Sequence, residues 1–339
     1  MNGLILMNPA QISAMSPVYS WGLEVIRAIQ IFKSPGLTSF MQFASSLGSQ
    51  YFYIVIILFI FWCVNEKNGF SLGILIIVSA WINAALKVLF NQPRPNEFEP
   101  ALALVFEPSR GFPSGHAQMS MTFWGMIALF LAYRFARGKK YRPLIFSLAG
   151  FIILLVGFSR LYLGVHFPTD IFGGWVFALI ILGLFILLHK KACSLFLKGG
   201  KRLQLISAAA ISLIMNALYP QDTSLSGLFL GFCAGYSLMI GSFRFTAASP
   251  AGKGPRPVML GLRFILGLAI AAVIFMGLKY ILPGNDSYFA GVKFLDYFDN
   301  LAYFIRYGLV GLWASAGAPG IFRNFGLAGS DDPPVQISE

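Results

Sequence analysis

The chain has 339 residues, of which 57% are hydrophobic and only 11% are charged, and its formal net charge is +12. Soluble domains carry charge on about a quarter of their residues, so this composition excludes an ordinary soluble domain. Apolar runs of about 20 residues, the length that crosses a bilayer, recur along the chain and predict a polytopic membrane protein. The surplus of Lys and Arg is typical of the cytoplasmic loops of such proteins, and no aromatic-basic module indicates a nucleic-acid partner.

Residues 1–47 form a mixed N-terminal segment before the first apolar run. Between Trp21 and Lys33, apolar residues are interspersed with charged ones at helical spacing, which predicts an amphipathic helix lying on the membrane. An ordinary packed helix ahead of the first span is an equally good interpretation. The sequence Ser34-Pro35-Gly36 is expected to end this helix. No basic stretch followed by a sustained apolar run and a cleavage site is seen, so no cleaved signal peptide is expected.

Nine apolar segments follow and are interpreted as spans. They cover residues 48–64, 70–90, 114–133, 144–160, 169–188, 203–219, 225–243, 259–282 and 297–317. The predicted fold is an all-α, polytopic membrane helical bundle. Its predicted parts are an interfacial amphipathic segment at 1–47, a core at 48–189, an additional C-terminal transmembrane bundle at 190–320 and a disordered tail at 321–339. In one span Gly227, Gly231 and Gly235 recur every four residues, a pattern that lets helices pack closely.

Basic residues gather in alternate loops, and this sets the expected orientation. The loops at 134–143, 189–202 and 244–263 are rich in Lys and Arg, so they are expected in the cytoplasm together with the C-terminal tail. The loops at 91–112, 159–168, 220–224 and 283–296 are then expected on the opposite side, which is periplasmic, extracellular or luminal.

The three cysteines lie in or beside apolar runs and lack the spacing of metal ligands; they are Cys63, Cys193 and Cys233. Neither a disulfide framework nor a metal site is expected from them, and no cofactor is predicted. His189 heads a basic loop and is interpreted as an interfacial residue. Arg306 lies unusually deep in its predicted span, where a charge faces a protein interior or a water-filled groove, unless the span starts later.

Three polar clusters interrupt the apolar sequence, and charges at membrane depth are costly enough to indicate a function. The first cluster runs from Lys87 to Pro95. Lys87 lies near the outer end of its span, and Arg94 follows it by about two helical turns. Pro93 and Pro95 are expected to end the helix and to leave Arg94 on an irregular rim. Taken alone, Lys87 could equally extend to lipid head groups.

The second cluster, Pro113-Ser114-Gly115-His116, opens a helix. Backbone N–H groups at a helix start, and the positive end of the helix dipole, favour an anion. Ser114 could cap the helix or donate to a phosphate oxygen, and Gly115 lets a ligand approach the backbone. His116 is then placed to give a proton to a leaving oxygen. The alternative is a capped helix with a buried, satisfied histidine.

The third cluster runs from Ser159 to Asp170. Pro168 suits the first position of a helix, so His166 lies just before the helix and Asp170 lies one turn after His166. Asp170 can accept a hydrogen bond from one imidazole nitrogen, which leaves the other nitrogen to attack. Arg160 offers a planar fork for two phosphate oxygens. The alternative is an interfacial salt bridge between Arg160 and Asp170, beside a histidine that only fills space.

The motifs Lys87-x6-Arg94-Pro95, Pro113-Ser114-Gly115-His116 and Ser159-Arg160-x5-His166-x3-Asp170 together resemble the three-part signature of the type 2 phosphatidic acid phosphatase (PAP2) superfamily. They match without a departure and span residues 87–170, about a quarter of the chain. The resemblance implies a metal-independent phosphatase with a PAP2-like catalytic core at 48–189. By position it implies His166 as the nucleophile that forms a phosphohistidine, Asp170 as the group that orients it and His116 as the acid. It also implies that the phosphoryl oxygens are held by Lys87, Arg94, Ser114, Gly115 and Arg160.

The extra C-terminal spans are similar in layout to those of glucose-6-phosphatase and sphingosine-phosphate phosphatases. We therefore expect an integral-membrane phosphatase whose partner is a membrane lipid phosphate or diphosphate at the extracytoplasmic face. Candidate substrates are phosphatidate, lysophosphatidate, phosphatidylglycerol phosphate, polyprenyl diphosphates and sphingoid phosphates. A lipid phosphotransferase and a sugar-phosphate phosphatase would use the same intermediate. A transporter or scaffold would also suit charges within a membrane, but the complete set of nucleophile, orienting group and acid argues against it.

Overall fold

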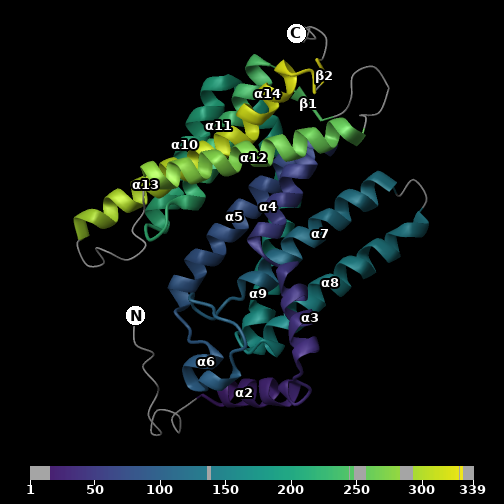
Figure 1. Cartoon of the computed structure of the whole chain (residues 1–339), viewed down its shortest axis with the longest axis vertical. Coiled ribbons are helices and arrows are strands. Elements are labelled where there is room, and N and C mark those ends of the chain that lie inside the picture. The colour runs from purple at the N-terminus through teal and green to yellow at the C-terminus, as the bar shows by residue number, and fades with distance from the viewer. Residues whose placement is uncertain are drawn as a thin grey trace. The chain divides into compact units, whose positions relative to one another are not determined.

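The computed structural model describes residues 16–135, 139–243, 245–247, 257–282, 293–327 and 329–330. Its elements in chain order (Figure 1) are α2 (Pro17–Gln30), α3 (Pro35–Ser46), α4 (Gln50–Phe59), the π-helix η1 (Ile60–Val64), α5 (Glu66–Phe90), α6 (Pro95–Phe98), the 3₁₀ helix η2 (Pro100–Leu102), α7 (Gly115–Phe135), the 3₁₀ helix η3 (Lys139–Tyr141), α8 (Arg142–Tyr162), α9 (Pro168–Lys198), α10 (Gly200–Leu218), α11 (Ser224–Ser242), β1 (Phe245–Thr246), α12 (Pro257–Ile281), α13 (Lys293–Leu312), the π-helix η5 (Trp313–Gly317), α14 (Ala318–Asn324) and β2 (Gly329–Ser330). The strands β1 and β2 form one short antiparallel pair, with Phe245 opposite Ser330. The all-α membrane fold expected from the sequence is confirmed.

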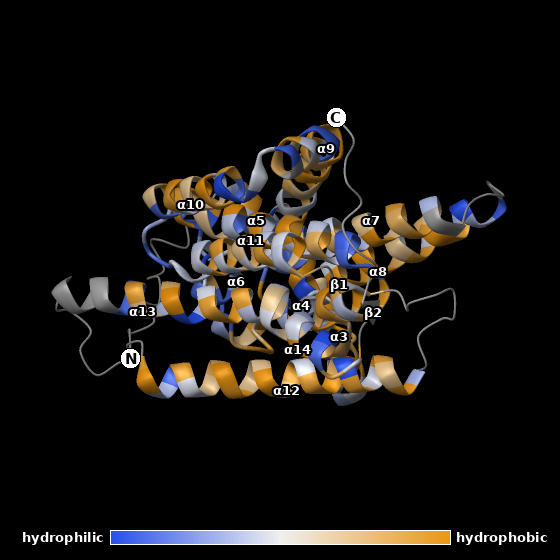
Figure 2. Ribbon diagram, turned by 90° about the horizontal axis from the view of Figure 1, so that it is seen from above, coloured by the Kyte–Doolittle hydropathy of each residue, from blue (hydrophilic) through white to orange (hydrophobic). Residues whose placement is uncertain are grey.

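Each of the nine predicted spans coincides with a helix, but fewer helices are long and apolar enough to cross a membrane by composition alone. In the part of the chain that the structure describes there are five, or six if the pair Pro35–Ser46 and Gln50–Val64, bent by 49°, counts as one span. Figure 2 shows one of the five, α12, to be apolar along most of its length. The predicted number is higher because α7, α10 and α13 carry polar residues near their starts, such as Gln118, Lys201 and Asp299.

The chain divides into two compact units, the first made of residues 1–53 with 82–187 and the second of residues 54–81 with 188–339. The N-terminal helices α2 and α3 fall within the first unit. Helix α14 extends into the stretch 321–339 that the sequence predicts to be disordered, because Phe322 is fully buried there. Residues 331–339 lie outside the described part of the chain, and the predicted division into a core, a C-terminal bundle and flanking segments stays a prediction.

In the first unit, α2 packs against protein along one face. Ser16 caps its start, and Leu23 and Ile26 are buried against Leu102 and Phe167. The opposite side leaves large apolar side chains exposed, among them Trp21 at 48%. The helix ends at Gln30, and Ser34 then caps α3 by accepting the N–H of Leu37. The predicted helix is therefore present and packed on the protein along one face.

In the second unit, α11 and α13 approach closely through the glycines spaced by four residues. A Cβ added at Gly227 would lie 2.2 Å from the carbonyl oxygen of Phe304, and one at Gly231 would lie 1.8 Å from that of Gly308. A Cβ at Gly235 would lie 2.1 Å from Oγ of Ser315 in η5. Distances this short leave no room for a side chain, so the predicted role of these glycines in helix packing is confirmed.

Gly231→Ala is expected to destabilise the second unit by about 1–3 kcal/mol, because the added methyl group overlaps the Gly308 carbonyl and forces α11 and α13 apart. Gly241→Ala in the same helix is the matched control. Nothing lies within 4 Å of an added Cβ at Gly241, so its better helix propensity should leave stability unchanged or slightly higher. Thermal unfolding in detergent measures both variants. If Gly231→Ala melted at the same temperature as Gly241→Ala and the wild type, the contact between α11 and α13 would not have the importance proposed for it.

Two arginines of the second unit are buried within helices. Arg263, which the sequence places at the end of a cytoplasmic loop, lies in α12 and is 1% exposed. It donates hydrogen bonds to the carbonyl oxygens of Trp62, Ala247 and Leu327. Arg306 is 3% exposed, and its guanidinium carbon lies 5.1 Å from the centre of the Tyr303 ring. Of the settings expected for Arg306, the protein interior is the one observed.

Candidate active site

The starts of α7 and α9 meet within the first unit. The backbone N–H of Ser114 donates to the carbonyl oxygen of Asp170 at 2.9 Å. Gly174 permits this approach, because a Cβ there would lie 2.7 Å from the carbonyl oxygen of Ser114. A direct backbone contact therefore brings the second and third sequence clusters together. Since both helices begin here, the positive ends of their dipoles lie in the same region.

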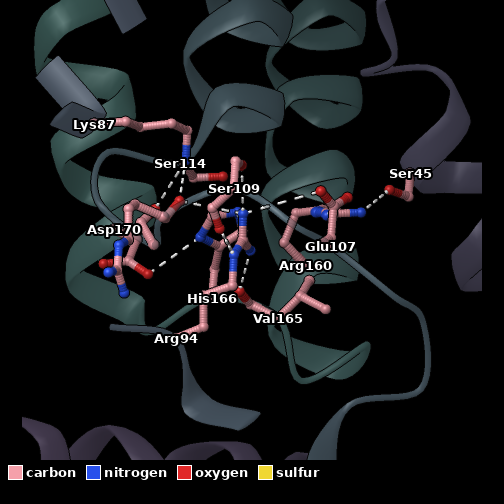
Figure 3. A network of polar contacts seen from close by, with 12 residues as sticks. Ser45, Lys87, Arg94, Glu107, Ser109, Ser114, Arg160, Val165, His166 and Asp170 are labelled. Carbon is pink, nitrogen blue, oxygen red and sulfur yellow. Dashed lines mark hydrogen bonds and ion pairs between the residues drawn. The ribbon is translucent and has the colours of Figure 1, made fainter. Parts of the chain in front are cut away.

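His166 is 1% exposed and pairs with Asp170, as their spacing predicts. Its Nδ1 lies 3.1 Å from Oδ2 of Asp170, which also accepts the backbone N–H of Phe167 at 2.9 Å (Figure 3). Its Nε2 lies 3.3 Å from Nη1 of Arg94. Because a carboxylate only accepts hydrogen bonds, Nδ1 carries the proton and Nε2 carries the lone pair. The second carboxylate oxygen of Asp170, Oδ1, is buried and has no hydrogen-bond partner among the described residues.

Two of the three predicted phosphate-binding cations, Arg94 and Lys87, have their closest contacts with backbone oxygens near this histidine (Figure 3). Arg94 is 3% exposed, and its Nη1 donates to the carbonyl oxygen of Val165 at 2.6 Å. The Nζ atom of Lys87 donates to the carbonyl oxygen of Gly111 at 3.3 Å. Both cations are therefore held by backbone oxygens beside the imidazole, and Lys87 is directed to the loop before α7.

Arg160 is the third predicted cation, and it does not form the salt bridge with Asp170 that was the alternative interpretation. Its Nη1 donates to Oγ of Ser45 at 2.7 Å, and its Nη2 donates to the carboxylate of Glu107. Its Nε is buried and has no hydrogen-bond partner among the described residues. Native proteins pair most buried polar groups, so this donor is available to an oxygen of a ligand.

The second cluster supplies a helix cap and a partly exposed imidazole. Oγ of Ser114 accepts the backbone N–H of Ala117 at 3.4 Å. Gly115 packs against Asn83, since a Cβ at Gly115 would lie 3.1 Å from Oδ1 of Asn83. His116 lies in the first turn of α7 and is partly exposed. The capped helix of the alternative interpretation is present, and the role of His116 as an acid stays a prediction.

Burial lowers the pKa of His166 well below its usual 6.5, because it disfavours the charged imidazolium. The positive charges of Arg94, Lys87 and Arg160, and of His116 when it is protonated, lower this pKa further. The His166 imidazole is consequently uncharged at neutral pH, with the lone pair on Nε2 able to attack.

The acid limb of kcat/KM is expected below pH 6.5, the usual pKa of a histidine. The reactive form of His166 is the unprotonated one, and a lowered pKa preserves that form as the pH falls. The profile should be measured with two substrates whose phosphate groups ionise differently, because only the limb that belongs to the enzyme is common to both. An acid limb at or above pH 6.5 with both substrates would count against His166 as the attacking group.

Three side chains of the site were not predicted from the sequence. Glu107 and Ser109 belong to the loop before α7, and Ser45 belongs to α3. Glu107 accepts from Arg160, and Oγ of Ser109 accepts from Nη2 of Arg94 at 3.0 Å. The only signal available in the sequence was a group of carboxylates in the loop between the first and second clusters, and nothing in it singled out Glu107.

The third histidine and the cysteines lie in the second unit. Nε2 of His189 lies 2.9 Å from Oγ of Ser71 and 3.4 Å from Sγ of Cys193. All three cysteines are free thiols. Within the described ranges, no group of three or more His, Cys, Asp and Glu side chains is arranged to hold a metal ion.

Two family profiles match this chain, one mostly in its first half and one in its second half. A profile described as PAP2 superfamily matches residues 68–193, and one described as PAP2 superfamily phosphatase, transmembrane extension, matches residues 223–330. Phosphatidylglycerophosphatase B of Bacillus subtilis is 32% identical over 161 residues, which are 46% of this chain and 77% of that protein. The probable sphingosine-1-phosphate phosphatase of Dictyostelium discoideum is 28% identical over 167 residues, which are 48% of this chain and 41% of that protein.

Among solved structures, a transmembrane PAP2 type phosphatidylglycerolphosphate phosphatase from Bacillus subtilis matches with a TM-score of 0.46 and 29% identity. The match covers 54% of this chain and 90% of that chain. The first profile includes all three polar clusters, and the second falls on the C-terminal helices. The chain thus spans most of the Bacillus protein but less than half of the Dictyostelium one.

Proposed function

This chain belongs to the PAP2 superfamily of membrane phosphatases, and from that premise we propose that it hydrolyses a lipid phosphate or diphosphate through a phosphohistidine intermediate. One observation carries the proposal. Nδ1 of His166 lies 3.1 Å from Oδ2 of Asp170, while Nε2 faces the guanidinium of Arg94. An imidazole with one nitrogen fixed by a carboxylate and the other beside a cation is suited to attack a bound phosphate.

In the first step, Nε2 of His166 forms a bond to phosphorus, and the bond from phosphorus to the leaving oxygen breaks. His116 gives its proton to that oxygen, so the leaving group departs protonated. The bound phosphate is an anion, and it favours the protonated form of His116 at this stage. The carboxylate of Asp170 stabilises the positive charge that develops on the imidazole ring.

In the second step, a water molecule attacks phosphorus from the side that the leaving group has vacated. His116, now unprotonated, takes a proton from this water. The bond between Nε2 and phosphorus breaks, and its electron pair returns to His166. Inorganic phosphate leaves, and the site is restored with His116 protonated.

The remaining site residues hold the phosphoryl oxygens. Lys87, Arg94 and Arg160 supply positive charge, and the buried Nε of Arg160 has a hydrogen to donate. The Ser114 hydroxyl and the backbone N–H of Gly115 add donors at the start of α7. Phosphoryl transfer depends mainly on positioning and charge stabilisation, so these groups contribute most of the rate enhancement in this scheme.

A lipid substrate is supported by where the clusters lie along the helices. Lys87 is near the end of α5, Arg160 near the end of α8 and Asp170 at the start of α9, and all three helices are apolar enough to span a membrane. A lipid head group lies at such a depth while its chains stay in the bilayer. The names of the two relatives above refer to phosphate esters of lipids, and we propose the same class here.

Phosphate release from a substrate panel tests the proposed function. The purified full chain in detergent and chelator is given phosphatidate, lysophosphatidate, phosphatidylglycerol phosphate, a polyprenyl diphosphate, a sphingoid phosphate and glucose 6-phosphate. We expect release from at least one lipid and none from the His166→Ala variant. An added lipid alcohol that becomes phosphorylated would identify transfer instead of hydrolysis. No release from any lipid, or equal release from the variant, would refute the proposal.

The site is proposed to face away from the cytoplasm, with the C-terminus inside. Phe106, beside the site, is 85% exposed, and Tyr141, in a basic loop, is 57% exposed. After Cys193→Ser, a cysteine introduced by Phe106→Cys should react with an impermeant maleimide on right-side-out vesicles. One introduced by Tyr141→Cys should react only after the vesicles are permeabilised. The reverse pattern would overturn the orientation inferred from loop charge.

A further inference from the structure

A single short stretch, residues 107–111, contacts all three cations of the site. Lys87 donates to the carbonyl oxygens of Arg110 and Gly111, and Arg94 donates to Ser109 and Arg110. Arg160 donates to the side chain of Glu107 (Figure 3). Most of these acceptors are neutral carbonyl or hydroxyl oxygens, and the Glu107 carboxylate is the one anion among them.

The carboxylate of Glu107 lies between the two arginines. Oε1 accepts from Nη2 of Arg160, and Oε2 lies 3.9 Å from Nη2 of Arg94. Both arginine side chains are 3% exposed, while that of Glu107 is 24% exposed. Two buried cations side by side are costly without a nearby anion. The two oxygens of this carboxylate face two guanidinium groups. Two oxygens of a bound phosphate would be held in the same arrangement.

We infer that Glu107 is an internal counter-ion that occupies the arginine end of the phosphate site when no substrate is bound and competes with the incoming phosphoryl group for Arg160 and Arg94. This inference rests on the proposed role of these arginines as phosphate ligands. Glu107 thereby weakens the binding of any phosphate, including the product.

The local structure allows Glu107 to withdraw. It lies in the irregular stretch between η2 and α7, so no helical hydrogen bond has to break when it moves. The neighbouring Phe106 is 85% exposed, and residues 108–110 are exposed as well. A phosphate monoester carries a charge of about −1.5 to −2 at neutral pH, so it binds two arginines more strongly than a single carboxylate does and repels that carboxylate.

Glu107 could instead serve only to hold Arg160 in place, and the two roles predict opposite results. A positioning group that is removed leaves the arginine misplaced, which weakens phosphate binding and lowers kcat. A competitor that is removed strengthens phosphate binding. The binding of inorganic phosphate and of orthovanadate, measured apart from turnover, separates these cases.

The decisive variant is Glu107→Gln, which keeps the shape and an acceptor for Arg160 but removes the charge. We expect the dissociation constants of phosphate and orthovanadate, measured by calorimetry on the full chain in detergent, to fall about tenfold, since an interaction with a charged partner is worth about that factor or more. Glu107→Ala should shift them in the same direction. Glu99→Gln is the matched control, because it removes the same charge from a carboxylate that pairs with Arg27 instead.

Tighter phosphate binding in both Glu107 variants, with phosphate binding by Glu99→Gln unchanged, would support the inference. Unchanged or weaker binding in the Glu107 variants, equal tightening in the Glu99 control, or binding in none of the proteins would overturn it. Phosphate release from lipids is scored separately in the same preparations. Release without any change in phosphate affinity would leave the proposed function standing and remove only the role given to Glu107.

Discussion

His166→Ala is expected to lower kcat/KM for the best lipid substrate by at least about 10³-fold, because it removes the atom that forms the covalent bond to phosphorus. His166 is almost completely buried, and its Nε2 faces Arg94 across 3.3 Å. No other described imidazole has the same carboxylate partner, so a neighbouring side chain is not placed to take over the attack. The measurement is initial-rate phosphate release from detergent-solubilised protein.

A second measurement distinguishes loss of the nucleophile from loss of the fold. Wild-type protein mixed with labelled lipid phosphate and quenched within milliseconds should retain label that is stable in base and labile in acid, as expected of a phosphohistidine. His166→Ala should retain none, while its melting temperature stays close to that of the wild type. His189→Ala is the control, since that histidine contacts Ser71 and Cys193 in the second unit. Wild-type activity in His166→Ala would rule out the covalent scheme.

Asp170→Asn is expected to reduce kcat by about 10³-fold while KM changes little, because it removes the negative charge beside His166 and leaves the attacking imidazole in place. Oδ2 of Asp170 accepts both Nδ1–H of His166 and the N–H of Phe167. An amide of the same shape can keep one acceptor there, but it no longer stabilises a positive imidazole. The loss therefore falls on the chemical step more than on substrate binding.

The control for this variant is Asp222→Asn, which makes the same chemical change in the second unit, where Oδ1 of Asp222 accepts the N–H of Ser224. It should leave kcat unchanged. Single-turnover experiments should show that the slow step in Asp170→Asn is formation of the phosphoenzyme. A loss confined to KM would mean that Asp170 acts only through substrate binding, contrary to the expectation.

Much of the candidate site could be predicted from the sequence because its key spacings are local. His166 and Asp170 are four residues apart at the start of a helix, so helix geometry alone brings the carboxylate to the ring. Ser114 is followed directly by a helix, and its capping role needs no long-range information. Loop charge predicts that all three clusters lie on the same side of the bilayer, and this prediction made it reasonable to expect them close together.

Other features depend on contacts that no periodic pattern encodes. Glu107 reaches Arg160 from an irregular loop, and the path of such a loop is not fixed by hydropathy. The amphipathic pattern around Trp21 fits a membrane surface and a protein surface equally well, so only the contacts of α2 show that it buries one face on the protein. The number of spans stays a prediction, because α7 and other helices combine the length of a span with polar residues, and composition alone identifies five or six spans among the described residues.

The hydrogen bond from the Ser114 N–H to the Asp170 carbonyl has a consequence for how freely this protein can diverge. Both atoms belong to the main chain, so the hydrogen bond between the two helix starts does not depend on which side chain stands at either position. The outward-facing residues Phe151, Phe158 and Phe172 are all exposed. They can be exchanged to suit a bilayer of another composition without touching the hydrogen bond between the two helix starts.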